Sequence, residues 1–287
     1  MSLPVYDRHR RTVIPEPQFG ERRLRFLYRT WPGRLLLKAI FARPWYSELS
    51  AAYDRTSYST RKIAPFVARY HIALDEYPGQ HYASFADFIT RRIDPARRPI
   101  APAPALIAVA DAKLLVYHIT AEGRIPVKHA VYSIVALLRD EQLARAYVGG
   151  TCLVFRLSAD DYHRYCFCDD GTVKLSRDLP GWLHTVQPIG ESRAYIENHR
   201  RFDLIATKHF GDMVVVEVGA LLVGKIHDHQ VREAQRGQEK GYFALGGSSI
   251  VLLFAAGAVT LDADILEQSA QGIETRVRLG EKIGAHA

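Results

Sequence analysis

Four short stretches of the chain contain side chains that together can activate a serine hydroxyl. Asp111 supplies a carboxylate, His163 and His184 supply imidazoles, and Ser248 supplies a hydroxyl that directly follows two glycines. A base that takes the hydroxyl proton, and a carboxylate that orients the base, are the parts of a nucleophilic site. Taken singly, each stretch has a plainer interpretation as a turn, a core residue or a surface residue. Only their combination indicates a catalytic site.

Other sequence signatures of chemistry are missing or weak. The chain has no phosphate-binding loop, no dinucleotide fingerprint and no Gly-x-Ser-x-Gly elbow. Cys166 and Cys168 are too close together for a zinc clip and have no second pair. His227 and His229 flank an aspartate and could bind a metal from one face of a strand, but a solvated loop after Ile226 is the favoured interpretation. We therefore expect no metal.

Length and composition describe a chain that can bury a sizeable core. It has 287 residues, 48% of them apolar, and no run of 18 uncharged apolar residues that would span a membrane. Residues 1–18 lack the apolar segment of a secretory signal, and three cysteines cannot all pair within one chain. We therefore expect a protein of the cytosol or of a membrane surface.

Charge is distributed unevenly along the chain. The formal net charge is +7, and residues 1–100 contain 18 basic and 9 acidic residues, whereas residues 101–287 contain 20 basic and 22 acidic residues. The excess positive charge therefore lies in the first third of the sequence. This asymmetry indicates an anionic partner for the N-terminal region, either a membrane or a nucleic acid.

Two amphipathic helices are expected in residues 21–45, which hold seven basic residues and one acidic residue. Pro32 suits the first turn of the second helix. Basic, tryptophan and leucine side chains on one unit are typical of a helix at a membrane interface, and packing on the protein's own body is the alternative. Two sets of residues have the spacing of one helix face: Leu24, Leu27, Tyr28 and Trp31 in the first helix, and Leu36, Leu37, Ile40 and Phe41 in the second.

The rest of the chain divides into a helical and a strand-rich part. Residues 1–20 are expected to form an irregular leader, further helices are expected in 60–72 and 84–100, and the proline-rich residues 101–105 mark a boundary. We predict an α+β fold, with a helical, basic region over 1–100 and a mostly antiparallel β body over 101–287. The expected strands are 106–119, 151–157, 213–226 (half-buried, from its alternation) and 242–255, with one helix at 132–147.

Seven segments, read together, carry a more specific signal. In this order they resemble the phosphatidylserine decarboxylase family of pyruvoyl-dependent, self-processing enzymes, from about residue 24 to the C-terminus. The segments are SFADFITRRIDPARRPI, VADAKLLVYHI, YVGGTCLVFRLSADDYHRYCF, LHTVQPIG, YIENHRRF, VVVEVGALLVGKI and EKGYFALGGSSIVLLF.

The resemblance implies that the chain cuts itself between Gly247 and Ser248. The Ser248 hydroxyl attacks the Gly247 carbonyl, β-elimination releases the upstream piece, and hydrolysis leaves a pyruvoyl group at Ser248. The products are a β-chain of residues 1–247 and an α-chain of residues 248–287, which stay associated because residues 250–254 form a core strand. The pyruvoyl ketone is then expected to form a Schiff base with the amine of phosphatidylserine, so that CO₂ leaves and phosphatidylethanolamine forms.

The resemblance also assigns roles to the other candidate residues. Asp111 is expected to orient a histidine for self-cleavage, and His163 matches a histidine that serves decarboxylation. Family members commonly have a second histidine, the base for the serine, where this chain has Cys166, and a neutral thiol is a poor base. His184 is our candidate for that base, with His163 in both roles as the alternative. Gln187 replaces the usual asparagine of the family.

Two substrates fit this scaffold. One is phosphatidylserine in a membrane, and the other is a free or peptide-linked amino acid in a specialised pathway. The basic residues 21–45 favour the lipid, because each Lys or Arg near an anionic membrane adds about 1 kcal/mol of attraction. We therefore expect peripheral association with the cytoplasmic face of a membrane, although the same helices could join two copies into a homodimer.

A third possibility is a nucleic-acid-binding module. Tyr28, Trp31 and Trp45 lie among arginines and could stack on bases. The β body, however, is slightly acidic and contains no recognisable nucleic-acid-binding motif. We therefore expect no nucleic acid partner.

Overall fold

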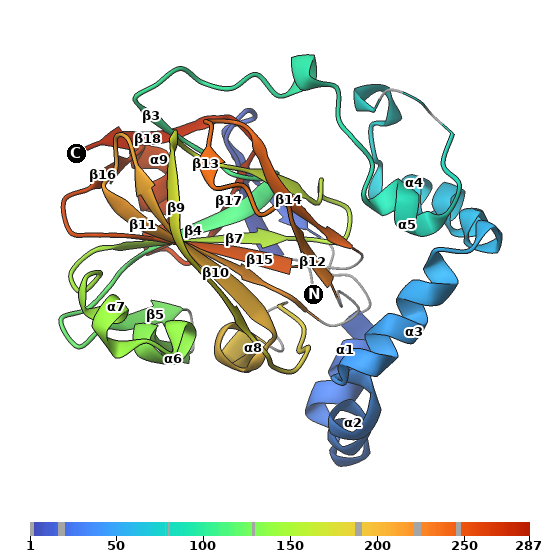
Figure 1. The fold of residues 1–287 in the computed structure, drawn as a ribbon. Helices are drawn as coiled ribbons and strands as arrows, with labels where there is room; N and C mark the ends of the chain where they lie inside the picture. The colour runs from blue at the N-terminus through green and yellow to red at the C-terminus, as the bar shows by residue number, and fades with distance from the viewer. Residues whose placement is uncertain are drawn as a thin grey trace.

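Strands dominate the chain after residue 100, and helices lie mostly before it (Figure 1). The α+β fold expected from the sequence is therefore confirmed. The boundary near residue 100 stays a prediction. The computed structural model describes residues 3–16, 21–77, 79, 81–127, 130–186, 191–220, 225–244 and 248–287.

One large sheet forms the centre of the body. Neighbouring strands pair antiparallel, except that β1 and β17 run parallel. Within the described residues its order is β13 (Glu233–Ala234), β9 (Gly171–Leu179), β10 (Arg200–Thr207), β11 (Asp212–Val218), β15 (Ser248–Phe254), β7 (Thr151–Leu157), β4 (Ala112–His118), β17 (Glu274–Val277), β1 (Leu3–Asp7) and β2 (Thr12–Glu16).

The central strands of this sheet are buried on both faces. All residues of β15 are buried between β11 and β7. In β11, Val214 and Val216 pack into one apolar cluster, whereas Val215 packs into another on the opposite face, and Glu217 is also fully buried. The expectation of a half-buried strand over 213–226 is therefore wrong, because layers on both sides cover the sheet.

Smaller sheets and short helices form those covering layers. Tyr165 and Phe243 of one small sheet and Ile265 of α9 belong to the core on the Val215 face. Residues of the other body helices belong to the core on the Val214 face. The small sheets are β12 (Lys225–Asp228), β14 (Glu239–Ala244) and β8 (Arg164–Cys166); β16 (Val259–Leu261), β18 (Lys282–His286) and β3 (Ala105–Ile107); and β5 (Arg124–Val127) and β6 (Ala130–Ser133). The helices are α6 (Ile134–Leu138), α7 (Glu141–Arg145), α8 (Glu191–Glu197) and α9 (Ala263–Ala270).

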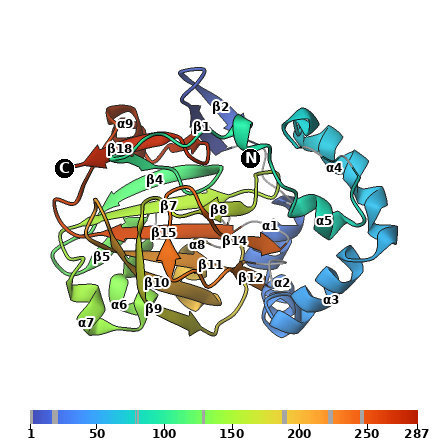
Figure 2. The same cartoon turned by 45° about the horizontal axis from the view of Figure 1, so that its top comes forward.

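A helical arm lies between strand β2 and the other strands of the body in the sequence. Figures 1 and 2 both place it along one side of the β body. Phe85, Phe88 and Ile89 pack in its own small core, as their spacing predicts. The arm contains α1 (Glu21–Arg29), α2 (Trp31–Leu36), the π-helix Leu37–Phe41, α3 (Pro44–Asp54), the 3₁₀ turns Ser57–Lys62, Leu74–Glu76 and Pro95–Arg97, α4 (Ile63–Tyr70) and α5 (Phe85–Ile89).

The first two helices of the arm do not share one apolar face. Leu24 and Leu27 are buried as expected, but Trp31 is 73% exposed. The reason is a helix break: the Thr30 side chain accepts a hydrogen bond from the Gly33 amide and starts α2 with a new orientation.

Two further sequence expectations are wrong. The leader is a hairpin, β1 and β2, which joins the large sheet through β17, so a long-range partner orders it. The single helix expected at 132–147 is β6 followed by two short helices. Arg139 adopts a left-handed backbone conformation with φ of 50°, and the Asp140 side chain caps the start of α7.

Candidate active site

Ser248 is the first described residue of β15 and lies in the interior of the sheet. It pairs with Leu157 of β7, and Ser249 pairs with Arg156. Both serines are 0% exposed, and neither hydroxyl has a hydrogen-bond partner among the described residues. Leaving a buried hydroxyl unsatisfied costs about 1–3 kcal/mol, so a purely structural role does not account for Ser248. Gly247, the other residue of the expected cleavage site, lies outside the described residues.

His163 is tied to the same region by the backbone. β7 ends at Leu157, the partner of Ser248, and the chain then leads to His163, whose carbonyl accepts a hydrogen bond of 3.0 Å from the Phe243 amide. The His163 side chain is buried, and its Nδ1 lies 2.8 Å from the carbonyl oxygen of Asp161. A carbonyl oxygen only accepts, so Nδ1 carries a proton and Nε2 is the basic nitrogen of the ring.

Asp111 is engaged by an arginine in the described part of the chain. Its carboxylate accepts hydrogen bonds of 2.6–3.1 Å from Arg98 and one of 2.8 Å from the Leu279 amide. Arg98 also donates to Glu76 of the arm. The Asp111 carboxylate therefore joins the arm to the C-terminal segment, and its expected role in orienting a histidine stays a prediction.

Cys166 has the surroundings of a structural thiol. It is buried in β8, and its amide donates to the Val109 carbonyl. Burial raises the pKa of the Cys166 thiol to about 12. The thiol is therefore neutral at physiological pH, which supports the view that Cys166 is a poor base for Ser248.

Asn198 brings His184 to the end of the sheet where Ser248 lies. The buried Asn198 side chain accepts from the His184 amide (2.7 Å) and donates to the carbonyls of His184 (2.8 Å) and Gly219 (2.6 Å). Gly219 directly follows β11, whose last residue pairs with Ser249. Val186, two residues after His184, belongs to the same apolar core as Leu157, the partner of Ser248.

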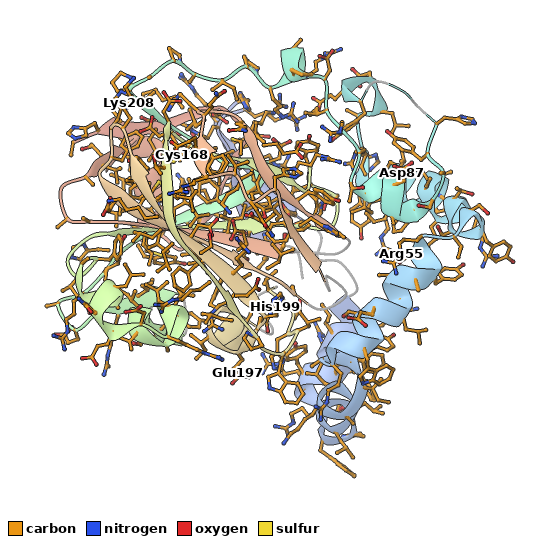
Figure 3. The ribbon with its side chains drawn as sticks, viewed as in Figure 1. Arg55, Asp87, Cys168, Glu197, His199 and Lys208 are labelled. Atoms are coloured by element: carbon orange, nitrogen blue, oxygen red, sulfur yellow. The ribbon has the colours of Figure 1, made fainter. Side chains whose placement is uncertain are left out.

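The His184 imidazole lies between the arm and helix α8. Its Nε2 is 3.2 Å from a Glu197 carboxylate oxygen, and its Nδ1 is 3.4 Å from the Tyr28 hydroxyl of α1. The Thr185 amide donates to the same hydroxyl over 2.9 Å. Figure 3 shows Glu197 and His199 together at the end of the body that faces α1, far from Cys168 and Lys208. Gln187 lies outside the described residues.

A buried lysine surrounded by three carboxylates was missed by the sequence interpretation. Nζ of Lys240 lies 2.5–2.6 Å from carboxylate oxygens of Asp203, Glu217 and Asp228. These three side chains are close enough together to hold a metal ion, and the lysine ammonium lies among them. Burial raises the pKa of Glu217 to about 7, and Lys240 offsets only part of this effect. The one signal in the sequence was a glutamate inside an otherwise apolar strand.

A second buried charge network lies beside Ser249 and was also missed. Arg156 is paired with Glu274, and Lys113 is paired with Glu16 and Asp161. Burial raises the pKa of Asp161 to about 7 against the opposing effect of Lys113. The network links β2, β4, β7 and β17, and therefore positions the strands on the β7 side of the candidate site.

The His227–His229 stretch is not a solvated loop throughout. His227 belongs to β12 and stacks on Tyr242, with ring centroids 4.6 Å apart. His229 follows the strand and pairs with Glu239 at 2.7 Å. The loop interpretation is therefore wrong for His227, because pairing with β14 extends the strand past Ile226.

Comparison with known proteins identifies the class of enzyme to which this site belongs. The sequence profile of the family described as phosphatidylserine decarboxylase matches residues 85–285. A phosphatidylserine decarboxylase proenzyme 2 of Clostridium acetobutylicum is 44% identical over 287 residues, covering 99% of both chains. Proenzymes of Desulfitobacterium hafniense (36%) and Clostridium novyi (35%) align over 98% of this chain and 98% and 99% of their own.

These matches cover nearly the whole chain. The protein therefore belongs to the phosphatidylserine decarboxylase family of carboxy-lyases. The relatives are named as proenzymes, and the resemblance seen in the sequence segments is confirmed.

Proposed function

We propose that this protein decarboxylates phosphatidylserine to phosphatidylethanolamine after cutting itself between Gly247 and Ser248. The observation that carries the proposal is Ser248: a buried hydroxyl with no hydrogen-bond partner among the described residues, at the head of a core strand and directly after two glycines. The proenzyme names of the relatives support the self-cleavage. The products are a β-chain of residues 1–247 and an α-chain of residues 248–287.

The surroundings of Ser248 fit a covalent pyruvoyl group made from it. When present, this group supplies an electron sink for the carbanion left by CO₂. The chain's own contribution is a site closed to water, since Ser248, Ser249 and His163 are all 0% exposed. Exclusion of water protects a reactive carbanion from unwanted proton transfer and strengthens each electrostatic contact.

The histidines divide the proton transfers. His163, with its Nδ1 proton held by a carbonyl, presents Nε2 for proton transfer in the decarboxylation step. His184 takes the proton of Ser248 during self-cleavage, with His163 in both roles as the alternative. Asp111 supports the site as a carboxylate held by Arg98.

The exposed surface of the arm supports a lipid substrate over a free amino acid. No described helix is long and apolar enough to cross a bilayer. Large apolar side chains are nevertheless exposed on α2 and α3: Trp31, Leu35, Trp45 and Leu49. Exposed basic residues accompany them: Arg23, Arg25, Arg29, Arg34, Lys38 and Arg43.

This combination suits peripheral binding to an anionic membrane on its cytoplasmic face. Apolar side chains enter the interface while arginines contact lipid phosphates. A decarboxylase of a soluble amino acid would have no use for such a surface, so its removal should separate the two substrate proposals.

The test is a time course of the chain made by cell-free synthesis, followed by denaturing gel and intact mass. We expect a fragment of residues 248–287 with a blocked N-terminus, and a single full-length species for Ser248→Ala. The processed protein should release CO₂ from phosphatidylserine in vesicles. A wild-type chain that stays whole contradicts self-processing, and release of CO₂ from free amino acids alone contradicts the lipid substrate.

A further inference from the structure

His184 is the histidine at this end of the sheet with a carboxylate on one ring nitrogen and a hydroxyl near the other. Glu197 lies 3.2 Å from Nε2, and the Tyr28 hydroxyl lies 3.4 Å from Nδ1. A carboxylate cannot donate a proton, so this contact favours the tautomer that has its proton on Nε2 and its lone pair on Nδ1. A carboxylate that fixes the tautomer and orientation of a histidine is the usual partner of a histidine base.

In the other histidine–carboxylate pairs of the described residues, the imidazole is more exposed than that of His184. His199, the residue before β10, pairs with Asp178 of β9, and the two side chains are 31% and 59% exposed. His184 is only 12% exposed, and Asn198 links its backbone to Gly219, next to the β11 residue opposite Ser249. Because the His199 carbonyl also accepts a hydrogen bond from the Gly219 amide, the lower exposure of its imidazole, and not its place in the fold, distinguishes His184 from His199.

Helix α1 completes the arrangement from the arm. The Tyr28 hydroxyl accepts a hydrogen bond of 2.9 Å from the Thr185 amide, which fixes this hydroxyl beside the His184 ring. The distance of 3.4 Å to Nδ1 is longer than a strong O–H···N hydrogen bond. The Tyr28 hydroxyl therefore marks the position of Nδ1, and the Ser248 hydroxyl can replace it as the hydrogen-bond donor to Nδ1 by coming closer.

We propose that Glu197 and Tyr28 are positioning residues that set the tautomer and orientation of His184 for self-cleavage. This inference rests on the proposed function, and it gives Glu197 the orienting role that the sequence suggested for Asp111.

The step balances without any further reactant. The Ser248 proton moves to Nδ1 of His184 while Oγ bonds to the Gly247 carbonyl carbon. The bond between that carbon and the Ser248 nitrogen then breaks as the imidazolium returns the proton to the nitrogen. Glu197 stays ionised and stabilises the imidazolium that exists between the two transfers.

The first test reads the tautomer directly and needs no activity. We would record ¹H–¹⁵N imidazole spectra of the uncut Ser248→Ala protein, and assign His184 by the signals lost in the Ser248→Ala, His184→Gln protein. We expect the Nε2–H form in Ser248→Ala, and a shift in tautomer population when Glu197→Gln is added. The Nδ1–H form as the main state would overturn the inference.

The second test follows cleavage after cell-free synthesis. Loss of the carboxylate that orients a histidine base costs up to about 10⁴-fold, so Glu197→Gln should cleave much more slowly than the wild type and Glu197→Asp should recover part of the rate. Tyr28→Phe should slow cleavage several-fold. The matched controls are Asp178→Asn, from the exposed His199 pair, and Tyr58→Phe, an exposed tyrosine of the arm.

The outcomes separate this inference from the proposed function. Cleavage of Glu197→Gln at the rate of Asp178→Asn contradicts the role of Glu197 while self-processing stands. A wild-type chain that never cleaves contradicts self-processing itself. If Glu197→Gln does not fold, as judged by circular dichroism, the tautomer in the Ser248→Ala protein still decides the question.

Discussion

At the scale of single residues, buried charges around β15 are compensated in small, closed groups. Lys240 contacts three carboxylates on β10, β11 and β12, and the side chains of Lys240 and Glu217 are at most 2% exposed. Removing one partner of a buried group leaves the others uncompensated, whereas an exposed pair contributes little to stability. Lys240 is therefore the residue whose positive charge stabilises all three carboxylates of this group.

Replacement of Lys240 by methionine tests this dependence. We expect Lys240→Met to lower the free energy of unfolding by about 3–5 kcal/mol, and Lys174→Met, from the half-exposed pair with Asp212, by about 1 kcal/mol or less. Urea unfolding would measure both. An equal, small effect of the two variants would contradict the argument.

The size of this effect should depend on pH. The pKa of Glu217 is raised from 4.5 to about 7, so the folded state binds this proton more tightly than the unfolded state. Its contribution to stability is therefore present at low pH and lost as pH rises through about 7. Without Lys240, the buried Glu217 carboxylate destabilises the fold more when it is ionised. Lys240→Met should therefore lower the free energy of unfolding more at pH 8 than at pH 5.

At the scale of elements, helices α2 and α3 of the arm present some large apolar side chains outward. The break at Thr30 turns Trp31 away from the buried face of α1, and Leu35 on α2 is 60% exposed. Burial of such a leucine contributes about 1.5–3 kcal/mol, which is enough to change membrane affinity about tenfold or more.

Sedimentation with vesicles tests the arm as a membrane-binding element. Trp31→Ser with Leu35→Ser should reduce binding to phosphatidylserine vesicles at least about tenfold, whereas Leu266→Ser, an exposed leucine on α9 of the body, should bind like the wild type. Binding should also weaken on neutral vesicles. Salt-sensitive DNA binding without vesicle binding would instead support the nucleic acid alternative.

At the scale of the whole molecule, the N-terminal hairpin holds the C-terminal segment. β1 pairs with β17, and Arg8 donates to the carboxylates of Asp262, Asp264 and Glu281 over 2.7–3.0 Å. All three acids lie after Ser248. The proposed α-chain is therefore held by β11, β7, β4 and β1, and not only by its own core strand.

Arg8→Ala should weaken this hold in the cut protein. We expect the two fragments to co-elute in native size exclusion, and the urea midpoint for release of residues 248–287 to fall in Arg8→Ala. Loss of charged hydrogen bonds corresponds to about 1–3 kcal/mol. Arg10→Ala, in the exposed turn of the same hairpin, is the control, and an equal shift in both variants would contradict the role of Arg8.

The sequence by itself determined the fold class, some of the local elements and the family. The apolar run 151–157 becomes a strand as its composition and bounding turn residues predict, whereas the single strand expected over 242–255 is β14 and β15. Helix α5 also forms as predicted, with Phe85, Phe88 and Ile89 buried on one face. The glycine pair before Ser248 and the order of seven segments were sufficient to identify the chemistry expected of the family.

Tertiary structure decided which groups meet. The leader becomes a hairpin because β17, more than 250 residues away, offers it an edge. Glu197 meets His184, and Lys240 meets Glu217, because pairing and packing bring distant segments together, and no local spacing encodes such contacts. Local propensity acts over a few residues, whereas burial of charge and hydrogen-bonding groups is satisfied only in the assembled fold.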